Sequence, residues 1–149
     1  MPQTPTHIFL QAGVGGLAAA CAVWARKLWG KAPRIIVVEP AFAPALFASV
    51  KAGAPQETTG PESNMGRLDC KEPSWIALKG LARDANMFMT ITEAQGNMGS
   101  HAVAQSGLPS SPSGAAGIAG VLAAANKADF GLTSTSCVLV VLSEEEPTQ

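Results

Sequence analysis

The sequence of 149 residues is poor in charge, in aromatic side chains and in the residues that bind metals or form disulfides. It contains no tyrosine, its aromatic content is 5%, and 14% of its residues are charged, with a net charge of −1. Because there is no basic run, nothing favours a nucleic acid or an anionic membrane as a partner. The three cysteines, Cys21, Cys70 and Cys137, are odd in number and widely spaced. They form neither a disulfide framework nor a CxxC metal site.

Long hydrophobic segments are also missing. No apolar run reaches the roughly 18–20 residues of a membrane span. The first residues, 1–5, lack the basic region and apolar core of a signal peptide, so we expect a cytoplasmic protein. Hydrophobic residues nevertheless make up 47% of the chain, which is enough to bury the core of one domain over residues 1–149. The low charged fraction indicates a surface that another domain or subunit normally covers.

The order of apolar runs and helix signals predicts an α/β fold. Continuous β-branched runs such as 34–40 are typical of strands buried on both faces of a parallel sheet. Glycines and cations mark the expected helix ends. The expected fold is a three-layer arrangement, with helices on both faces of a mostly parallel, twisted sheet. The strands are expected at 8–11, 34–40, 88–91 and 137–142, and the helices at 17–29, 41–52, 75–85, 92–105 and 115–126.

A glycine-rich junction joins the first strand to the first helix, in the order Gly13-Val14-Gly15-Gly16-Leu17. Glycine permits backbone angles that side chains forbid and lets the main chain approach a ligand closely. The first N–H groups of the helix have no intrahelical partner and lie at the positive end of its dipole. The junction therefore predicts a binding site for a phosphorylated cofactor.

One interpretation is a dinucleotide site. Gly13-x-Gly15-x-x-Ala18 matches the pattern G-x-G-x-x-G/A between a strand and a helix. Glu39 ends the next strand, where an acid can hold a ribose hydroxyl. An NAD(P)-binding, Rossmann-like domain is therefore one candidate.

A second interpretation comes from five segments that occur in order along the chain. They are Thr6–Ala18, Ile36–Pro40, Lys51–Gly53, Met65–Ser74 and Ser113–Gly117. Together they resemble the fold-type II pyridoxal-phosphate enzymes, the tryptophan synthase beta-like family, and within it the diaminopropionate ammonia-lyases. The loop Met65–Ser74 is not part of the dinucleotide-binding pattern. The ordered matches favour the lyase family over the dinucleotide site.

The resemblance implies roles for six residues around pyridoxal 5'-phosphate. The cofactor phosphate is expected on the backbone of the junction, and a hydroxyl at the end of the last strand is expected beside the pyridine nitrogen. A neutral hydroxyl there would not enforce a protonated ring. The residues that inherit these positions are Gly13, Val14, Gly15, Gly16 and Leu17 for the phosphate and Ser143 for the ring.

The resemblance covers only the C-terminal portion of such an enzyme. The lysine that forms a Schiff base with the cofactor belongs to an earlier motif, which no lysine here matches. The full enzyme would convert the amino acid 2,3-diaminopropionate to pyruvate and ammonia, and the resemblance suggests a homodimer. We expect this chain alone to show no turnover and to need the missing N-terminal part.

Three positions depart from the family pattern. Pro112 stands where the family has a glutamate near the ring, and Leu142 and Glu145 replace glycines expected beside the cofactor. These changes add bulk and charge where close packing is expected. They support a third hypothesis, an inactive remnant of a pyridoxal-phosphate enzyme.

Overall fold

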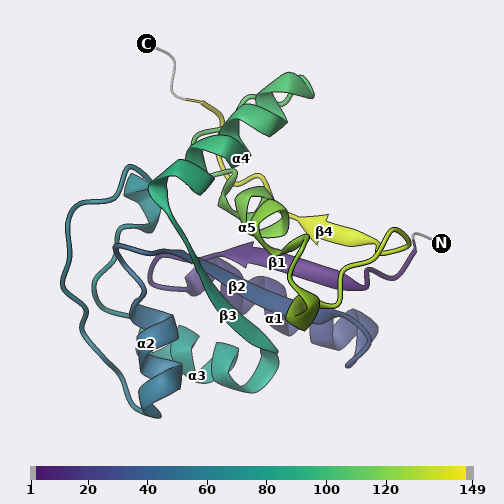
Figure 1. Ribbon diagram of the computed structural model, residues 1–149. Helices are drawn as coiled ribbons and strands as arrows, with labels where there is room; N and C mark the ends of the chain where they lie inside the picture. The colour runs from purple at the N-terminus through teal and green to yellow at the C-terminus, as the bar shows by residue number, and fades with distance from the viewer. Residues whose placement is uncertain (1–2, 147–149) are drawn as a thin grey trace.

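The computed structural model describes residues 3–146 and contains one four-stranded sheet in the order β3-β2-β1-β4 (Figure 1). The strands are β1 (His7–Gln11), β2 (Arg34–Pro40), β3 (Met87–Ile91) and β4 (Val138–Val140). All three pairings are parallel, and Phe9 of β1 lies opposite Ile36 of β2 and Val140 of β4. The carboxyl ends of the strands therefore meet at one edge of the sheet, where ligands bind in open α/β folds.

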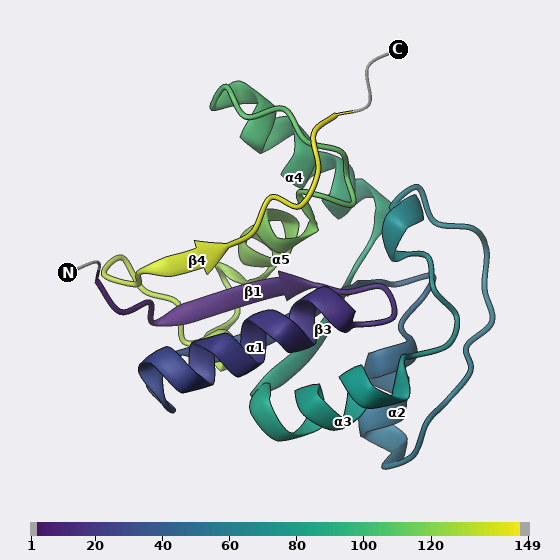
Figure 2. The same ribbon diagram turned by 180° about the vertical axis from the view of Figure 1, so that it is seen from behind.

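Helices cover both faces of this sheet. One face carries α1 (Gly16–Trp29), α2 (Ala45–Ala52) and α3 (Trp75–Asp84), as Figure 2 shows. The opposite face carries α5 (Ala116–Ala124), against which α4 (Glu93–Gln105) packs (Figure 1). Two short 3₁₀ turns, η1 (Gly66–Leu68) and η2 (Ala128–Phe130), lie in the connections.

Alternate side chains of the strands divide the core into two halves, as the period of a β-strand requires. On β1, Ile8 and Leu10 pack with the buried alanines of α1, whereas Phe9 packs with α5 and Phe130. Both central strands are buried on both faces, which explains their continuous apolar sequences. The expected α/β class with a parallel sheet between helical layers is confirmed.

Two expected boundaries differ from the structure. Helix α2 begins at Ala45, not Ala41, because a turn in which Ala43 N–H donates to Pro40 C=O precedes it. Strand β4 spans three residues and is half exposed, since it lies at the sheet edge; the expectation of a buried strand over 137–142 is wrong. Within residues 3–146, no helix combines the length and apolar character that crossing a membrane requires.

Candidate functional site

The glycine junction lies at the carboxyl end of β1 and is packed too closely for side chains at two positions. Gly15 has φ +104°, in the left-handed region, and a Cβ there would lie 3.0 Å from Leu46 Cδ1. A Cβ on Gly13 would lie 3.0 Å from both the Arg67 carbonyl oxygen and Cys70 Sγ. Only glycine satisfies both requirements, so the junction holds one fixed backbone path.

The backbone N–H groups of Gly13 to Leu17 have no protein acceptor among residues 3–146. The first bond of α1 is donated by Ala19 N–H to the Gly15 carbonyl at 2.8 Å, and no side chain caps the helix. These unpaired donors lie at the positive end of a helix of 14 residues. The arrangement is suited to an anion such as a phosphate group.

The loop Met65–Ser74 lies directly against this junction. Besides the Gly13 contact, Ser74 N–H donates to the Val14 carbonyl at 3.0 Å and Ser74 Oγ caps α3. The buried Met65 side chain anchors the other end of the loop against α4, where a Cβ on Gly96 would lie 2.9 Å from its Sδ atom. The loop that distinguishes the two interpretations of the sequence is thus part of the site.

The junction opens into a cavity of about 450 Å³ at the carboxyl edge of the sheet. The structure brings all six residues named from the sequence together around it. No lysine is among its lining residues within the described chain. The lining residues are Gln11, Ala12, Gly13, Val14, Gly15, Gly16, Leu17, Arg67, Leu68, Cys70, Ser143 and Glu144.

Ser143 reaches the cavity because the chain continues past β4 along the end of β1. Gln11, the last residue of β1, donates from Nε2 to Ser143 Oγ at 2.9 Å and to the Val141 carbonyl at 2.8 Å. Ser143 N–H donates to the Gly114 carbonyl at 3.4 Å. Two segments far apart in sequence are thereby held beside the glycine junction.

Glu144 adds the only carboxylate to the cavity lining within residues 3–146. Its carboxylate accepts a short hydrogen bond from Ser111 Oγ, and Oε2 lies 3.4 Å from Arg67 Nε. The Arg67 side chain is largely exposed at the mouth. The cavity therefore has one exposed cation beside the amide donors, with a carboxylate that partly neutralises it.

Glu39 does not take the ribose role that the dinucleotide interpretation assigns to it. Its side chain is 0% exposed, and its two carboxylate oxygens accept the Leu46 and Phe47 N–H groups at 2.8 and 2.7 Å. Glu39 therefore caps the N-terminus of α2 from below. Burial raises its pKa to about 7, although the two backbone hydrogen bonds act in the opposite direction.

The three departures from the family pattern lie differently from what the resemblance implies. Leu142 and Glu145 line a neighbouring hollow with Leu108 and Pro109, and neither lines the cavity at the glycine junction. Pro112 lies between Ser111, which contacts Glu144, and the start of α5. The bulk and charge of Leu142 and Glu145 therefore do not fill the candidate site.

Sequence reasoning missed Gln11, Arg67 and Glu144 as lining residues. Gln11 precedes the glycine turn directly, so its position at the end of an apolar strand was the available signal. Arg67 and Glu144 enter the site only through the packing of the loop and of the segment after β4, for which the sequence carries no local pattern.

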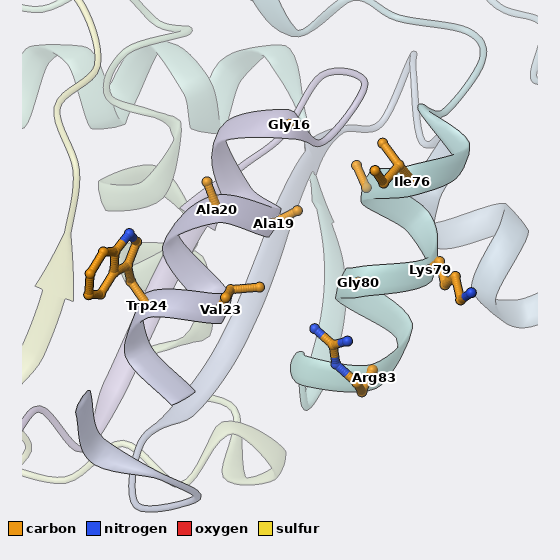
Figure 3. Close-up of a pocket in the computed structure, with 10 residues that line it drawn as sticks. Gly16, Ala19, Ala20, Val23, Trp24, Ile76, Lys79, Gly80 and Arg83 are labelled. Carbon is orange, nitrogen blue, oxygen red and sulfur yellow. The ribbon is translucent and has the colours of Figure 1, made fainter. Parts of the chain in front are cut away.

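A second hollow of about 440 Å³ lies between α1 and α3 (Figure 3). Its walls carry Val23 and Trp24 from α1 and Ile76 and Arg83 from α3. It offers alkyl and indole surface and the cations Lys79 and Arg83, but of the five junction residues only Gly16 borders it. The row of unpaired N–H groups that suits an anion is therefore a feature of the cavity at the glycine junction.

Several known proteins are similar to this chain. A diaminopropionate ammonia-lyase of Salmonella typhimurium is 36% identical over 90 residues, which cover 58% of this chain and 22% of that protein. The structure of diaminopropionate ammonia lyase from Escherichia coli, in complex with an aminoacrylate-PLP azomethine reaction intermediate, matches with a TM-score of 0.82 and 25% identity. That match covers 97% of this chain and 40% of the other.

Threonine deaminase isoform 2 from Solanum lycopersicum shares the fold with a TM-score of 0.87 at 18% identity, over 98% of this chain and 42% of that one. The chain thus spans less than half the length of each of these relatives. The family model described as pyridoxal-phosphate dependent enzyme matches residues 1–144. The fold, the glycine junction and this match together show that the chain belongs to the pyridoxal-phosphate dependent enzyme family.

Proposed function

We propose that this chain supplies the cofactor-binding wall of an ammonia-lyase that converts 2,3-diaminopropionate to pyruvate and ammonia. The observation that carries the proposal is the row of unpaired amides from Gly13 to Leu17, which border the cavity at the glycine junction. The similarity to the Salmonella typhimurium diaminopropionate ammonia-lyase supports the substrate. The rest of the enzyme, including its Schiff-base lysine, would come from polypeptide outside these residues.

The residues present fit the phosphate of pyridoxal 5'-phosphate. The N–H groups of Gly13, Val14, Gly15, Gly16 and Leu17 have no acceptor within residues 3–146, and the three glycines carry no side chain that could cover them. Backbone amides bind a phosphate dianion without the proton exchange that a titrating side chain would bring. Arg67 adds a cation at the mouth.

Ser143 fits the ring end of the same cofactor. Its hydroxyl lies in the cavity lining, and no carboxylate hydrogen-bonds to it within the described residues. When bound, pyridoxal phosphate supplies an electron-withdrawing ring that stabilises negative charge at the substrate α-carbon. The neutral Ser143 contact would set how strongly the ring withdraws electrons.

Titration calorimetry with inorganic phosphate and with pyridoxal phosphate tests the phosphate site. A Cβ on Gly16 meets no atom within 4 Å, so this position accepts a side chain. Gly16→Asp places a negative charge beside the amides and should weaken both ligands by about tenfold or more, because like charges repel. Gly16→Asn has the same shape without the charge and serves as the control.

Equal affinities in the Asp and Asn variants would contradict the assignment. Helix stability gives an independent check on folding, since an acid in the first turn of a helix is mildly stabilising. The Asp variant should therefore unfold at a slightly higher urea concentration than the Asn variant. Loss of ligand together with gain of stability separates a damaged site from a damaged fold.

The catalytic half of the proposal requires the missing lysine. We expect pyruvate to form from 2,3-diaminopropionate only when the chain is combined with a polypeptide that carries the Schiff-base lysine. The inactive-remnant hypothesis predicts cofactor binding without pyruvate under the same conditions. Pro112, in place of a glutamate near the ring, is the residue that favours this second outcome.

A further inference from the structure

Gln11 occupies an unusual place at the end of β1, between the start of α5 and the segment that follows β4. Its side chain is 3% exposed, although it belongs to the cavity lining. Nε2 lies within hydrogen-bond distance of three acceptors, the carbonyls of Gly114 at 3.1 Å and Val141 at 2.8 Å and Ser143 Oγ at 2.9 Å. One amide group thus connects three segments of the site.

The orientation of this amide is determined by its neighbours. If the amide were reversed, its oxygen would face two carbonyl oxygens, which repel it, whereas Nε2 as placed has two hydrogens that are shared among the three acceptors. The other end is confined by α5, because a Cβ on Gly117 would lie 3.0 Å from Gln11 Oε1. Oε1 is buried and has no hydrogen-bond partner among residues 3–146. The fold therefore leaves one atom of Gln11 unsatisfied while Nε2 keeps its contacts.

An amide nitrogen has no free lone pair, so Ser143 Oγ can only accept from Gln11 Nε2. The hydrogen of the Ser143 hydroxyl must then point elsewhere, and it has no acceptor among the described residues. Ser143 borders both this cavity and the neighbouring hollow lined by Leu142 and Glu145, so its free hydrogen can be turned toward the cavity. The hydroxyl is consequently presented to the cavity as a hydrogen-bond donor.

We propose that Gln11 is a positioning residue that makes the Ser143 hydroxyl a donor to the ring nitrogen of a bound pyridine, which is thereby kept unprotonated. The inference rests on the proposed function, in that it takes the cavity to hold a pyridoxal-phosphate ring. A donor hydroxyl pairs with a ring nitrogen that carries a lone pair, whereas a protonated nitrogen could only donate to Oγ and would leave the hydroxyl hydrogen without an acceptor. Gln11 thus sets the charge of the ring without touching it.

The probe for this proposal is deoxypyridoxine phosphate, an analogue of pyridoxal phosphate without the aldehyde. It needs no lysine, and its near-ultraviolet absorption changes when the ring nitrogen titrates. Bound to the unaltered chain of 149 residues, the ring nitrogen should have a pKa at least about one unit below that of the free probe. Gln11→Met, which keeps length but removes the donor, should abolish most of this shift.

The affinity for inorganic phosphate should stay within about twofold in Gln11→Met, because the amides of residues 13–17 are untouched. Gln11→Asn is shorter by one methylene, which withdraws the donor from Ser143, and it should therefore act like Gln11→Met. It replaces Gln11→Met in the experiment if Gln11→Met does not fold. Ser143→Thr keeps the hydroxyl and should preserve the shift.

The decisive measurement is the double variant. If Gln11 acts through Ser143, Gln11→Met changes nothing further in a Ser143→Ala background. A Gln11 effect that persists there means that Gln11 only supports the backbone, and it overturns the proposal. Probe that binds to the unaltered chain with an unshifted ring nitrogen overturns it as well. If neither phosphate nor probe binds, the proposed function is wrong, and this inference, which depends on it, is wrong as well.

Discussion

At the scale of single residues, the amide at the end of β1 and the acid near the end of β2 have separate roles. Gln11 holds the segment that carries Ser143, whereas Glu39 holds α2 by accepting the Leu46 and Phe47 N–H groups. In the sequence, an acid at this position is compatible with two roles, holding a ribose hydroxyl and capping a helix. The structure distinguishes these two roles, because the first turn of α2 lies against the Glu39 carboxylate.

Glu39 should make stability depend on pH. Burial raises its pKa from 4.5 to about 7, so the folded state binds the proton more tightly than the unfolded state. Its contribution is fully present below pH 4.5 and is lost as the pH rises through 7, at a cost of about 3 kcal/mol. Urea unfolding from pH 4.5 to 8 should show this decline in the unaltered chain and a flatter profile in Glu39→Gln. Parallel profiles would mean that Glu39 is not titrating in this range.

At the scale of elements, the sequence predicts which segments are helices and strands better than where they meet. The periodicity identifies α1, α3 and the two central strands because their burial patterns are local properties of the chain. It misplaces the start of α2 and the burial of β4, since these depend on a turn and on the absence of a neighbouring strand. The six expected site residues lie around one cavity, because the carboxyl ends of parallel strands share one edge.

The contact between α4 and α5 depends on a glycine that the sequence marks only as a weak helix position. A Cβ on Gly99 would lie 2.7 Å from Ala119 Cβ and 2.9 Å from the Ala119 nitrogen, so Gly99→Ala must push the helices apart. We expect a net loss of about 1–2 kcal/mol, as the packing cost exceeds the gain in helix propensity.

Gly80 in α3 is the matched control. The nearest atom to a Cβ there is Ala19 Cβ at 3.9 Å, which is ordinary contact. Gly80→Ala should therefore gain up to about 1 kcal/mol from helix propensity alone. Chemical denaturation of both variants checks the pair, and a destabilised Gly80→Ala would contradict the packing argument.

At the scale of the whole molecule, the outer surface of α1 and α3 carries large apolar side chains in the open. Ile76 is 86% exposed and Trp24 58% exposed, and both border the hollow of Figure 3. Apolar surface gathered in this way usually marks a contact with another protein surface. The low charged fraction of the sequence leads to the same expectation.

We expect the isolated chain to self-associate through this surface as its concentration rises. Ile76→Lys should reduce association in sedimentation velocity without lowering the urea midpoint, because the side chain contributes little to the core. Leu108→Lys, at another exposed apolar residue, is the control and should leave association unchanged. Association that resists Ile76→Lys would place the contact elsewhere.

The pairing of the last strand with the first has a consequence for synthesis. Thr6 N–H donates to the Cys137 carbonyl at 2.8 Å, so the closing contact joins residues from almost opposite ends of the chain. Such a long closure carries a large entropic cost and forms late. During synthesis, the glycine junction is therefore translated well before Ser143, which borders the same cavity. In a nascent chain, the glycine side of this cavity is therefore present before its serine side has been made.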